Sequence, residues 1–169
     1  MVLTKDELLS TLQKESRILA HLADKVDASM VDYRPTPKQR SSLELLRYMT
    51  IMGPFLIKAA KAGAFDMNSW TEANKAAEAR DWKQTVAVIK AQGDEYEKLL
   101  RDMSDADFRG EMTGFDGKPV SKGAFITNLV IGGHAAYRTQ LFCYLKSCGR
   151  DELGTMNLWG GMDAPAAQA

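Results

Sequence analysis

The stretch from Ser121 to Gly149 constrains the fold more than any other part of the sequence. One set of residues recurs through it at steps of three and four positions, the spacing of one face of an α-helix: Phe125, Leu129, Gly132, Gly133, Ala136, Tyr137, Gln140, Leu141 and Tyr144. No proline interrupts the run, and Gly149 follows it where a left-handed residue often ends a helix. Such a helix is roughly 40 Å long, enough to cross a small domain. We therefore expect it to form one side of the core.

Three further amphipathic helices are expected before it. The first covers residues 5–26. The second begins at Ser41 or Ser42 and ends at Gly63, and the third covers residues 81–103. Thr4 with Glu7 forms the pattern of a capping box, and Asp81 is suited to cap the third helix. Pro54 predicts a kink in the second helix, because proline cannot donate to the carbonyl group four residues earlier.

The connections complete the expected architecture. Pro35 and Pro37 predict an extended crossover after the first helix. Residues 71–79 are expected to form a short extra helix, and Asp116-Gly117 predicts a hairpin or ordered loop before the last helix. The fold class is all-α, a four-helix bundle, and residues 1–169 form a single domain. The tail, residues 150–169, has too many glycines and small residues for a helix. We expect its Met156, Leu158 and Trp159 to pack on the bundle, with contact to a second subunit as the alternative.

The composition excludes several classes of function. The 22 basic and 22 acidic residues cancel, so neither nucleic acid nor an anionic membrane is an expected partner. The longest apolar stretch, residues 48–60, contains Pro54 and Lys58 and is too short to cross a bilayer. The N-terminal sequence lacks the apolar core of a signal peptide, which favours the cytoplasm. Cys143 and Cys148 lie on different sides of one helix, so we expect no disulfide between them. We expect Cys143 to be a buried, inert thiol, and Cys148 to have a raised pKa at the helix C-terminus.

Three segments resemble the DinB-like (DinB/YfiT) superfamily. They are YRPTPKQRSSLELLRYM (residues 33–49), HAAYRTQLFCYLKSCG (134–149) and LGTMNLWGGMD (153–163). The resemblance implies a four-helix bundle that holds a divalent metal ion with three histidines, one on the second helix and an i, i+4 pair on the fourth. It also implies thiol-dependent transferase or isomerase chemistry with bacillithiol, mycothiol or glutathione, and a homodimer.

The sequence departs from this pattern at every metal ligand. With Arg138 and Gln140 as anchors, the fourth-helix ligand positions fall on Gly133 and Tyr137, and the second-helix position falls on Tyr48 or on a residue next to it. Glycine has no donor side chain, and a neutral phenol is a poor ligand in a site built for imidazole. We therefore expect no metal cofactor. The alternative is Zn²⁺ or Ni²⁺ held by substitute ligands, such as His134 and His21 with Glu15 or Asp24.

The candidate site is thus the position of the missing metal. It comprises Tyr48, Gly133, Tyr137, Arg138, Gln140 and His134. Two interpretations stay open: the phenols line a pocket for a small ligand, or they fill the space and join the two helices through hydrogen bonds. For His134, one residue out of register with the ligand positions, we expect a place on the helix surface or at an interface, with a role in the site as the alternative. His21 is expected to be packed or to face solvent.

Three functions are compatible with these observations. The favoured one is a non-catalytic or small-ligand-binding homodimer without a metal. The alternative is a metal-dependent thiol S-transferase that uses substitute ligands, and the third is a structural bundle that binds a protein partner.

Overall fold

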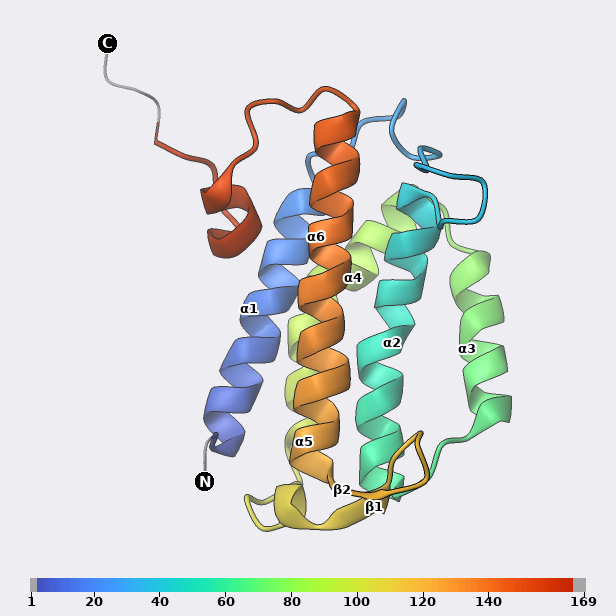
Figure 1. The fold of residues 1–169 in the computed structure, drawn as a ribbon, viewed down its shortest axis with the longest axis vertical. Helices are drawn as coiled ribbons and strands as arrows, with labels where there is room; N and C mark the ends of the chain where they lie inside the picture. Colours follow the sequence, from blue (N-terminus) through green and yellow to red (C-terminus); the bar gives the residue numbers. More distant parts are fainter. Residues whose placement is uncertain (1–2, 166–169) are drawn as a thin grey trace.

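Four long helices run alongside one another in the computed structural model, which describes residues 3–165 (Figure 1). They are α1 (Lys5–Ala23), α2 (Ser42–Ala62), α4 (Trp82–Leu100) and a continuous fourth helix composed of α5 (Lys122–Ile126), the π-helical segment η2 (Thr127–Ile131) and α6 (Gly132–Ser147). The predicted all-α four-helix bundle is confirmed. Within residues 3–165, no helix combines the length and the apolarity that crossing a bilayer requires.

Side-chain caps fix where the first three long helices begin. Thr4 with Glu7, Ser41 with Glu44, and Asp81 with Gln84 each form a complete capping box. These pairs satisfy backbone N–H groups that have no partner inside the helix. The helix ends are less well predicted, since α1 stops at Ala23 and α4 at Leu100, three residues earlier than expected in each case. Gly63 ends α2 with φ +75°.

The connections place two smaller elements beside α2. The helix α3 (Met67–Glu78) lies outside the bundle alongside α2 (Figure 1), and it is longer than the short helix expected there. The strands β1 (Glu111–Thr113) and β2 (Pro119–Ser121) form an antiparallel hairpin in which Met112 is opposite Val120. Gly117, at φ +77°, provides the left-handed turn residue that the Asp-Gly pair predicts. The short helix η1 (Asp107–Arg109) precedes the hairpin.

The core is built from large apolar side chains of all four long helices. Large apolar residues with less than 2% of their surface exposed come from α1 (Leu12, Ile18, Leu19 and Leu22), α2 (Leu45, Leu46, Met49 and Ile57), α4 (Ile89, Tyr96 and Leu100) and the fourth helix (Ile126, Val130, Leu141 and Leu145). Pro54 lies inside α2 without ending it. Gly53 beside it creates a notch, because a Cβ atom there would lie 1.9 Å from the Tyr96 hydroxyl oxygen.

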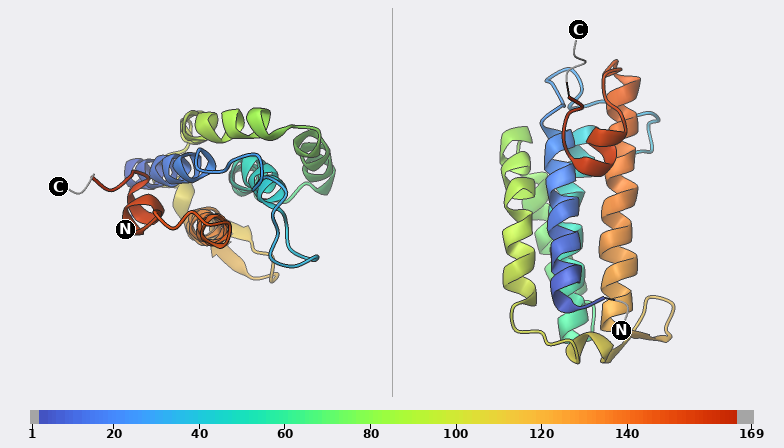
Figure 2. Two further views of the ribbon diagram at one scale, coloured as in Figure 1. Left: turned by 90° about the horizontal axis from the view of Figure 1, so that it is seen from above. Right: turned by 90° about the vertical axis from the view of Figure 1, so that its left-hand side faces the viewer.

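The C-terminal segment forms a helical turn that was not expected. Residues Met156–Gly160 make a single π-helical turn, η3, which packs against α1 and α6 (Figure 2). The close approach of this C-terminal segment to α1 requires a glycine at position 161. Gly161 has φ +64°, and a Cβ atom added there would lie 3.0 Å from the Ile18 Cα. The tail is anchored through Asn157, which is buried. Met156, Trp159 and Met162 nevertheless keep much of their surface exposed.

Candidate ligand pocket

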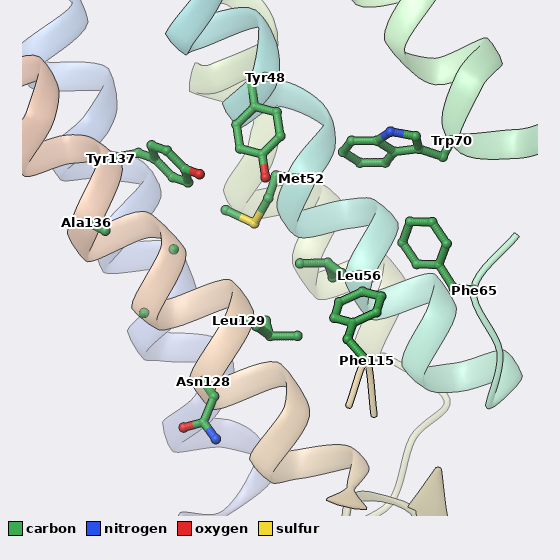
Figure 3. A pocket seen from close by; sticks show the side chains of 12 residues that line it. Tyr48, Met52, Leu56, Phe65, Trp70, Phe115, Asn128, Leu129, Ala136 and Tyr137 are labelled. Carbon is green, nitrogen blue, oxygen red and sulfur yellow. The ribbon is translucent and has the colours of Figure 1, made fainter. Parts of the chain in front are cut away.

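A cavity of about 440 Å³ lies between α2 and the fourth helix, and residues of α3 and the hairpin loop also line it (Figure 3). Most of its lining is apolar or aromatic, and none of the lining residues is acidic or basic: Tyr48, Met52, Leu56, Phe65, Trp70, Phe115, Asn128, Leu129, Gly132, Gly133, Ala136 and Tyr137. Of the six candidate residues, Tyr48, Gly133 and Tyr137 line this pocket together. These are the three positions at which the DinB resemblance places metal ligands.

The two tyrosines face each other across the upper part of the pocket. Their ring centroids are 5.1 Å apart at an interplanar angle of 68°, an edge-to-face contact, and Trp70 makes a similar contact with Tyr48 at 6.1 Å. Burial, and then the neighbouring Tyr137 phenol, raises the pKa of Tyr48 to about 12. The Tyr48 phenol therefore stays protonated at neutral pH, and a hydrogen bond with Tyr137 contributes to this shift of its pKa.

Gly133 makes room for a methionine. A Cβ atom at Gly133 would lie 2.7 Å from the Met52 Cε and 3.2 Å from its Sδ, so the Met52 side chain occupies the space beside the bare backbone. In Figure 3 the Met52 thioether lies below the Tyr48 ring, between α2 and α6. A flexible apolar side chain thus lies next to the position where the resemblance implies an imidazole.

These donors do not fit the metal site that the resemblance implies. The position offers two neutral phenols and a thioether in place of three imidazoles, whereas Zn²⁺ and Ni²⁺ in such sites are bound by nitrogen, thiolate or carboxylate groups. No group of three or more His, Cys, Asp or Glu side chains within residues 3–165 is arranged to hold a metal ion. The substitute ligand set is also dispersed: Glu15 binds Arg138, Asp24 pairs with Lys90, and the His21 ring contacts Asn157.

His134 lies in the core, and the expectation that it is on the helix surface is wrong. The side chain is fully buried, and its Nε2 lies 2.6 Å from the hydroxyl oxygen of Tyr96 on α4. Burial, and then the positive charge of Arg138, lowers the pKa of His134 to about 4, so the ring is neutral. Its Nδ1 has no hydrogen-bond partner among the described residues. His134 therefore does not line the pocket but joins α6 to α4 behind it.

Arg138 and Gln140 also point away from the pocket. The Arg138 Nε donates a 2.6 Å hydrogen bond to a carboxylate oxygen of Glu15 on α1, and this ion pair is almost fully buried. Another Arg138 nitrogen donates to the carbonyl oxygen of Leu158, which holds η3 on the bundle. Gln140 donates to the Tyr144 hydroxyl, which in turn donates to the Arg40 carbonyl oxygen at 3.0 Å. Both side chains thus hold the bundle and its connections together.

The cysteines differ in part from expectation. Cys143 is exposed on the outer face of α6, not buried among its apolar neighbours. Cys148 is half-buried, and its pKa is raised as expected, although the principal cause is burial, followed by the Asp27 charge. Both thiols are free.

The aromatic outer wall of the pocket was not anticipated from the sequence. Phe65 precedes α3, Trp70 belongs to α3, and Phe115 lies in the hairpin loop. Their rings form a chain of contacts in which Phe65 lies 6.0 Å from Trp70 and 5.4 Å from Phe115. The available signal was the presence of three aromatic residues in segments that are otherwise polar and weakly patterned.

Comparison with known proteins gives a clear result for the fold. No protein-family model matches the chain, and no curated protein matches its sequence. Three solved structures are similar. The DinB-like protein YjoA of Bacillus subtilis has a TM-score of 0.67 and 17% sequence identity, over 87% of this chain and 94% of that one. A DinB-like protein of Bacillus cereus has a TM-score of 0.67 and 14% identity, over 88% and 95% of the two chains, and YfiT of Bacillus subtilis has a TM-score of 0.64 and 14% identity, over 86% and 87%. YfiT is described as a probable metal-dependent hydrolase with an unusual four-helix-bundle topology. The protein therefore has the DinB-like four-helix-bundle fold.

Proposed function

We propose that this protein is a non-catalytic binding protein that holds a small, largely apolar molecule with a flat ring between α2 and α6. The observation that carries the proposal is the aromatic lining of the pocket at the position where the family resemblance implies a metal. Tyr48, Tyr137, Trp70, Phe65 and Phe115 all face it. Edge-to-face and offset contacts with such rings favour a planar ligand.

Size and chemistry support this proposal over catalysis. A volume of about 440 Å³ is within the range of small-molecule sites, which are typically apolar cavities with a few polar groups. The polar side-chain groups of the lining residues are the two phenols, the Asn128 amide and the Trp70 indole N–H. A general acid or base works best with a pKa near the working pH, whereas the pKa of Tyr48 is about 12. The lining therefore favours recognition of a ligand over its chemical conversion.

The proposal can be tested by isothermal titration with 2-naphthol as the probe. Gly132→Leu is designed to fill the pocket, because a Cβ atom at Gly132 has no neighbour closer than the Thr127 carbonyl oxygen at 3.9 Å. The variant also removes a helical glycine, which favours the fold by roughly 0.5–1 kcal/mol. We expect saturable binding to the wild type and a loss of at least about tenfold in affinity in the variant, since the added side chain takes up the volume of the ring.

Thr139→Leu is the matched control. Thr139 is exposed on α6 and does not line the pocket, so the same side chain placed there leaves 2-naphthol binding unchanged. Equal affinity in the wild type and Gly132→Leu would contradict binding in this pocket. Absence of saturable binding to the wild type would overturn the proposed function itself.

We further propose that the protein is a cytoplasmic homodimer. The free thiols of Cys143 and Cys148 are compatible with a reducing compartment. The exposed apolar side chains of Met156, Trp159 and Met162 supply surface for self-association. Light scattering after size exclusion should give twice the chain mass, and Trp159→Ser should shift the population toward monomer. A monomer at all concentrations would contradict the proposal.

A further inference from the structure

Arg40 places a positive charge against the ring that forms the upper wall of the pocket. It immediately precedes Ser41, the cap of α2, and its side chain is exposed. Its guanidinium carbon lies 4.1 Å from the centroid of the Tyr48 ring. The Tyr144 hydroxyl bonds to the Arg40 carbonyl oxygen at 3.0 Å, which fixes the backbone at this position.

The guanidinium of Arg40 has no carboxylate partner within residues 3–165. Its neighbour Arg34 is different, because the Arg34 Nη2 donates to Glu44 Oε1 at 3.0 Å. The Arg40 charge also acts on the Tyr48 phenol, since it opposes the upward shift of the Tyr48 pKa. Arg40 shares an outer cavity with Glu44 and Glu78 but forms no ion pair with either, and its charge favours negative charge at the Tyr48 hydroxyl.

The two phenols of the pocket can act as hydrogen-bond donors to a ligand. Figure 3 shows the Tyr137 hydroxyl directed toward Tyr48 and the Tyr48 hydroxyl directed down into the cavity, near Met52. Both groups donate when protonated, and no Asp or Glu side chain lines the pocket to repel an anion. A hydrogen bond between the two phenols is one cause of the raised pKa of Tyr48, so a carboxylate that accepts one hydrogen bond from each phenol takes the place of that bond.

We propose, on the basis of the binding function proposed above, that the ligand is an aromatic carboxylate. Its ring lies among Phe65, Trp70 and Phe115, and its carboxylate accepts hydrogen bonds from Tyr48 and Tyr137. Arg40 supplies the compensating charge across the Tyr48 ring, so it is a specificity-determining residue. A planar monoanion matches two phenols and one guanidinium on the far side of the Tyr48 ring, whereas a doubly charged phosphate requires more positive charge than the single guanidinium of Arg40 provides.

The aromatic lining by itself is also compatible with a cation. Ring faces attract ammonium groups, and a cage of aromatic side chains is the usual form of such a site. The Arg40 guanidinium already lies on the Tyr48 ring and repels a second positive charge. The position of Arg40 therefore favours the anion.

Three probes with the same ring system test the proposal by isothermal titration at low ionic strength: 2-naphthoate, 2-naphthol and (2-naphthylmethyl)trimethylammonium. We expect the wild type to bind 2-naphthoate most tightly, by about fivefold or more over 2-naphthol, and the ammonium probe most weakly. Arg40→Gln should weaken 2-naphthoate about fivefold and leave 2-naphthol unchanged, because only the charged group senses the guanidinium.

Arg34→Gln is the matched control, because it removes one positive charge from the same segment, where the charge is already paired with Glu44. We expect it to leave the preference for 2-naphthoate in place. Equal affinity of the wild type for 2-naphthoate and 2-naphthol, a preference for the ammonium probe, or an unchanged preference in Arg40→Gln would overturn this inference while the pocket remains a binding site. If none of the three probes binds, the proposed function falls together with it.

Discussion

The Tyr96 hydroxyl oxygen lies 2.6 Å from the Nε2 of His134, and both side chains are fully buried. The contact joins α4 to α6 through the centre of the bundle, directly behind the pocket. Gly53 on α2 leaves the space that the Tyr96 hydroxyl occupies. Three helices therefore meet at one buried hydrogen bond, and the stability of the bundle should depend on its surroundings.

Two glycine-to-alanine variants should have opposite effects on stability. In Gly53→Ala, the new Cβ would lie 1.9 Å from the Tyr96 hydroxyl oxygen, so the phenol has to move and its bond to His134 is disturbed. We expect a loss of about 1–3 kcal/mol, the usual cost of overpacking a core. Urea denaturation followed by circular dichroism measures the change.

Gly93→Ala is the control for the Gly53 variant. Gly93 also lies inside a long helix, but its nearest neighbour would be the Gln13 Cγ at 3.6 Å, an ordinary contact. Replacing this helical glycine should stabilise the protein by about 0.5–1 kcal/mol. A Gly53→Ala variant as stable as Gly93→Ala would show that Tyr96 does not depend on the notch.

The helices could be predicted because their signals are local. A capping box needs only two residues three positions apart, and all three observed boxes lie at expected helix starts. The Asp-Gly turn of the hairpin was equally readable. The short π-helical turn at Met156–Gly160 could not be predicted, because contacts with α1 and α6 hold it in place and its glycine-rich sequence does not favour a helix.

The orientation of the fourth helix was harder to predict, because its buried face carries polar residues. Four of its buried positions follow one another at steps of four: Ile126, Val130, His134 and Arg138. In a regular α-helix with about 3.6 residues per turn, residues spaced four apart move gradually around the helix axis. The wider i→i+5 turns of η2 at residues 127–131 reduce this rotation, so these positions stay on the buried face. The three- and four-residue spacing placed Gly133 and Tyr137 on the inner face, and His134 was expected outside because it is one residue out of register with the ligand positions. Only the partners on other helices, Tyr96 for His134 and Glu15 for Arg138, make those two residues stable inside.

The pocket was partly predictable for a different reason. The resemblance located Tyr48, Gly133 and Tyr137 together, since these positions correspond to one site in a known bundle. The outer wall of Phe65, Trp70 and Phe115 comes from a loop, an extra helix and a hairpin. Their approach to α2 depends on tertiary packing and carries no periodic signal in the sequence.

Protonation of His134 should make the protein less stable in mild acid. Its pKa is about 4 in the folded protein and near 6.5 in the unfolded chain. Below about pH 6.5 the unfolded chain binds a proton that the folded protein does not, so the free energy of unfolding falls as the pH decreases toward 4. The full effect is about 3 kcal/mol, and it should be absent above pH 7. Urea denaturation at a series of pH values measures it.

His134→Gln isolates this effect from that of the carboxylates. The amide can accept a hydrogen bond from Tyr96 but does not titrate, whereas His21 and the acidic residues contribute equally to both proteins. Between pH 7 and pH 4 the wild type should therefore lose about 3 kcal/mol more than the variant. Parallel pH profiles would mean that His134 accepts a proton in the fold without penalty.

Metal content separates the proposed binding function from a metal-dependent thiol transferase. Protein purified without a histidine tag should contain far less than one equivalent of Zn²⁺ or Ni²⁺ by mass spectrometry, because phenols and a thioether surround the position in question. The combined variant Tyr48→His, Gly133→His and Tyr137→His, with Met52→Ala to clear the space beside Gly133, is the positive control. It should bind Ni²⁺ in an equimolar ratio if the three positions converge as the pocket indicates. Stoichiometric metal in the wild-type protein would contradict the prediction and favour the transferase.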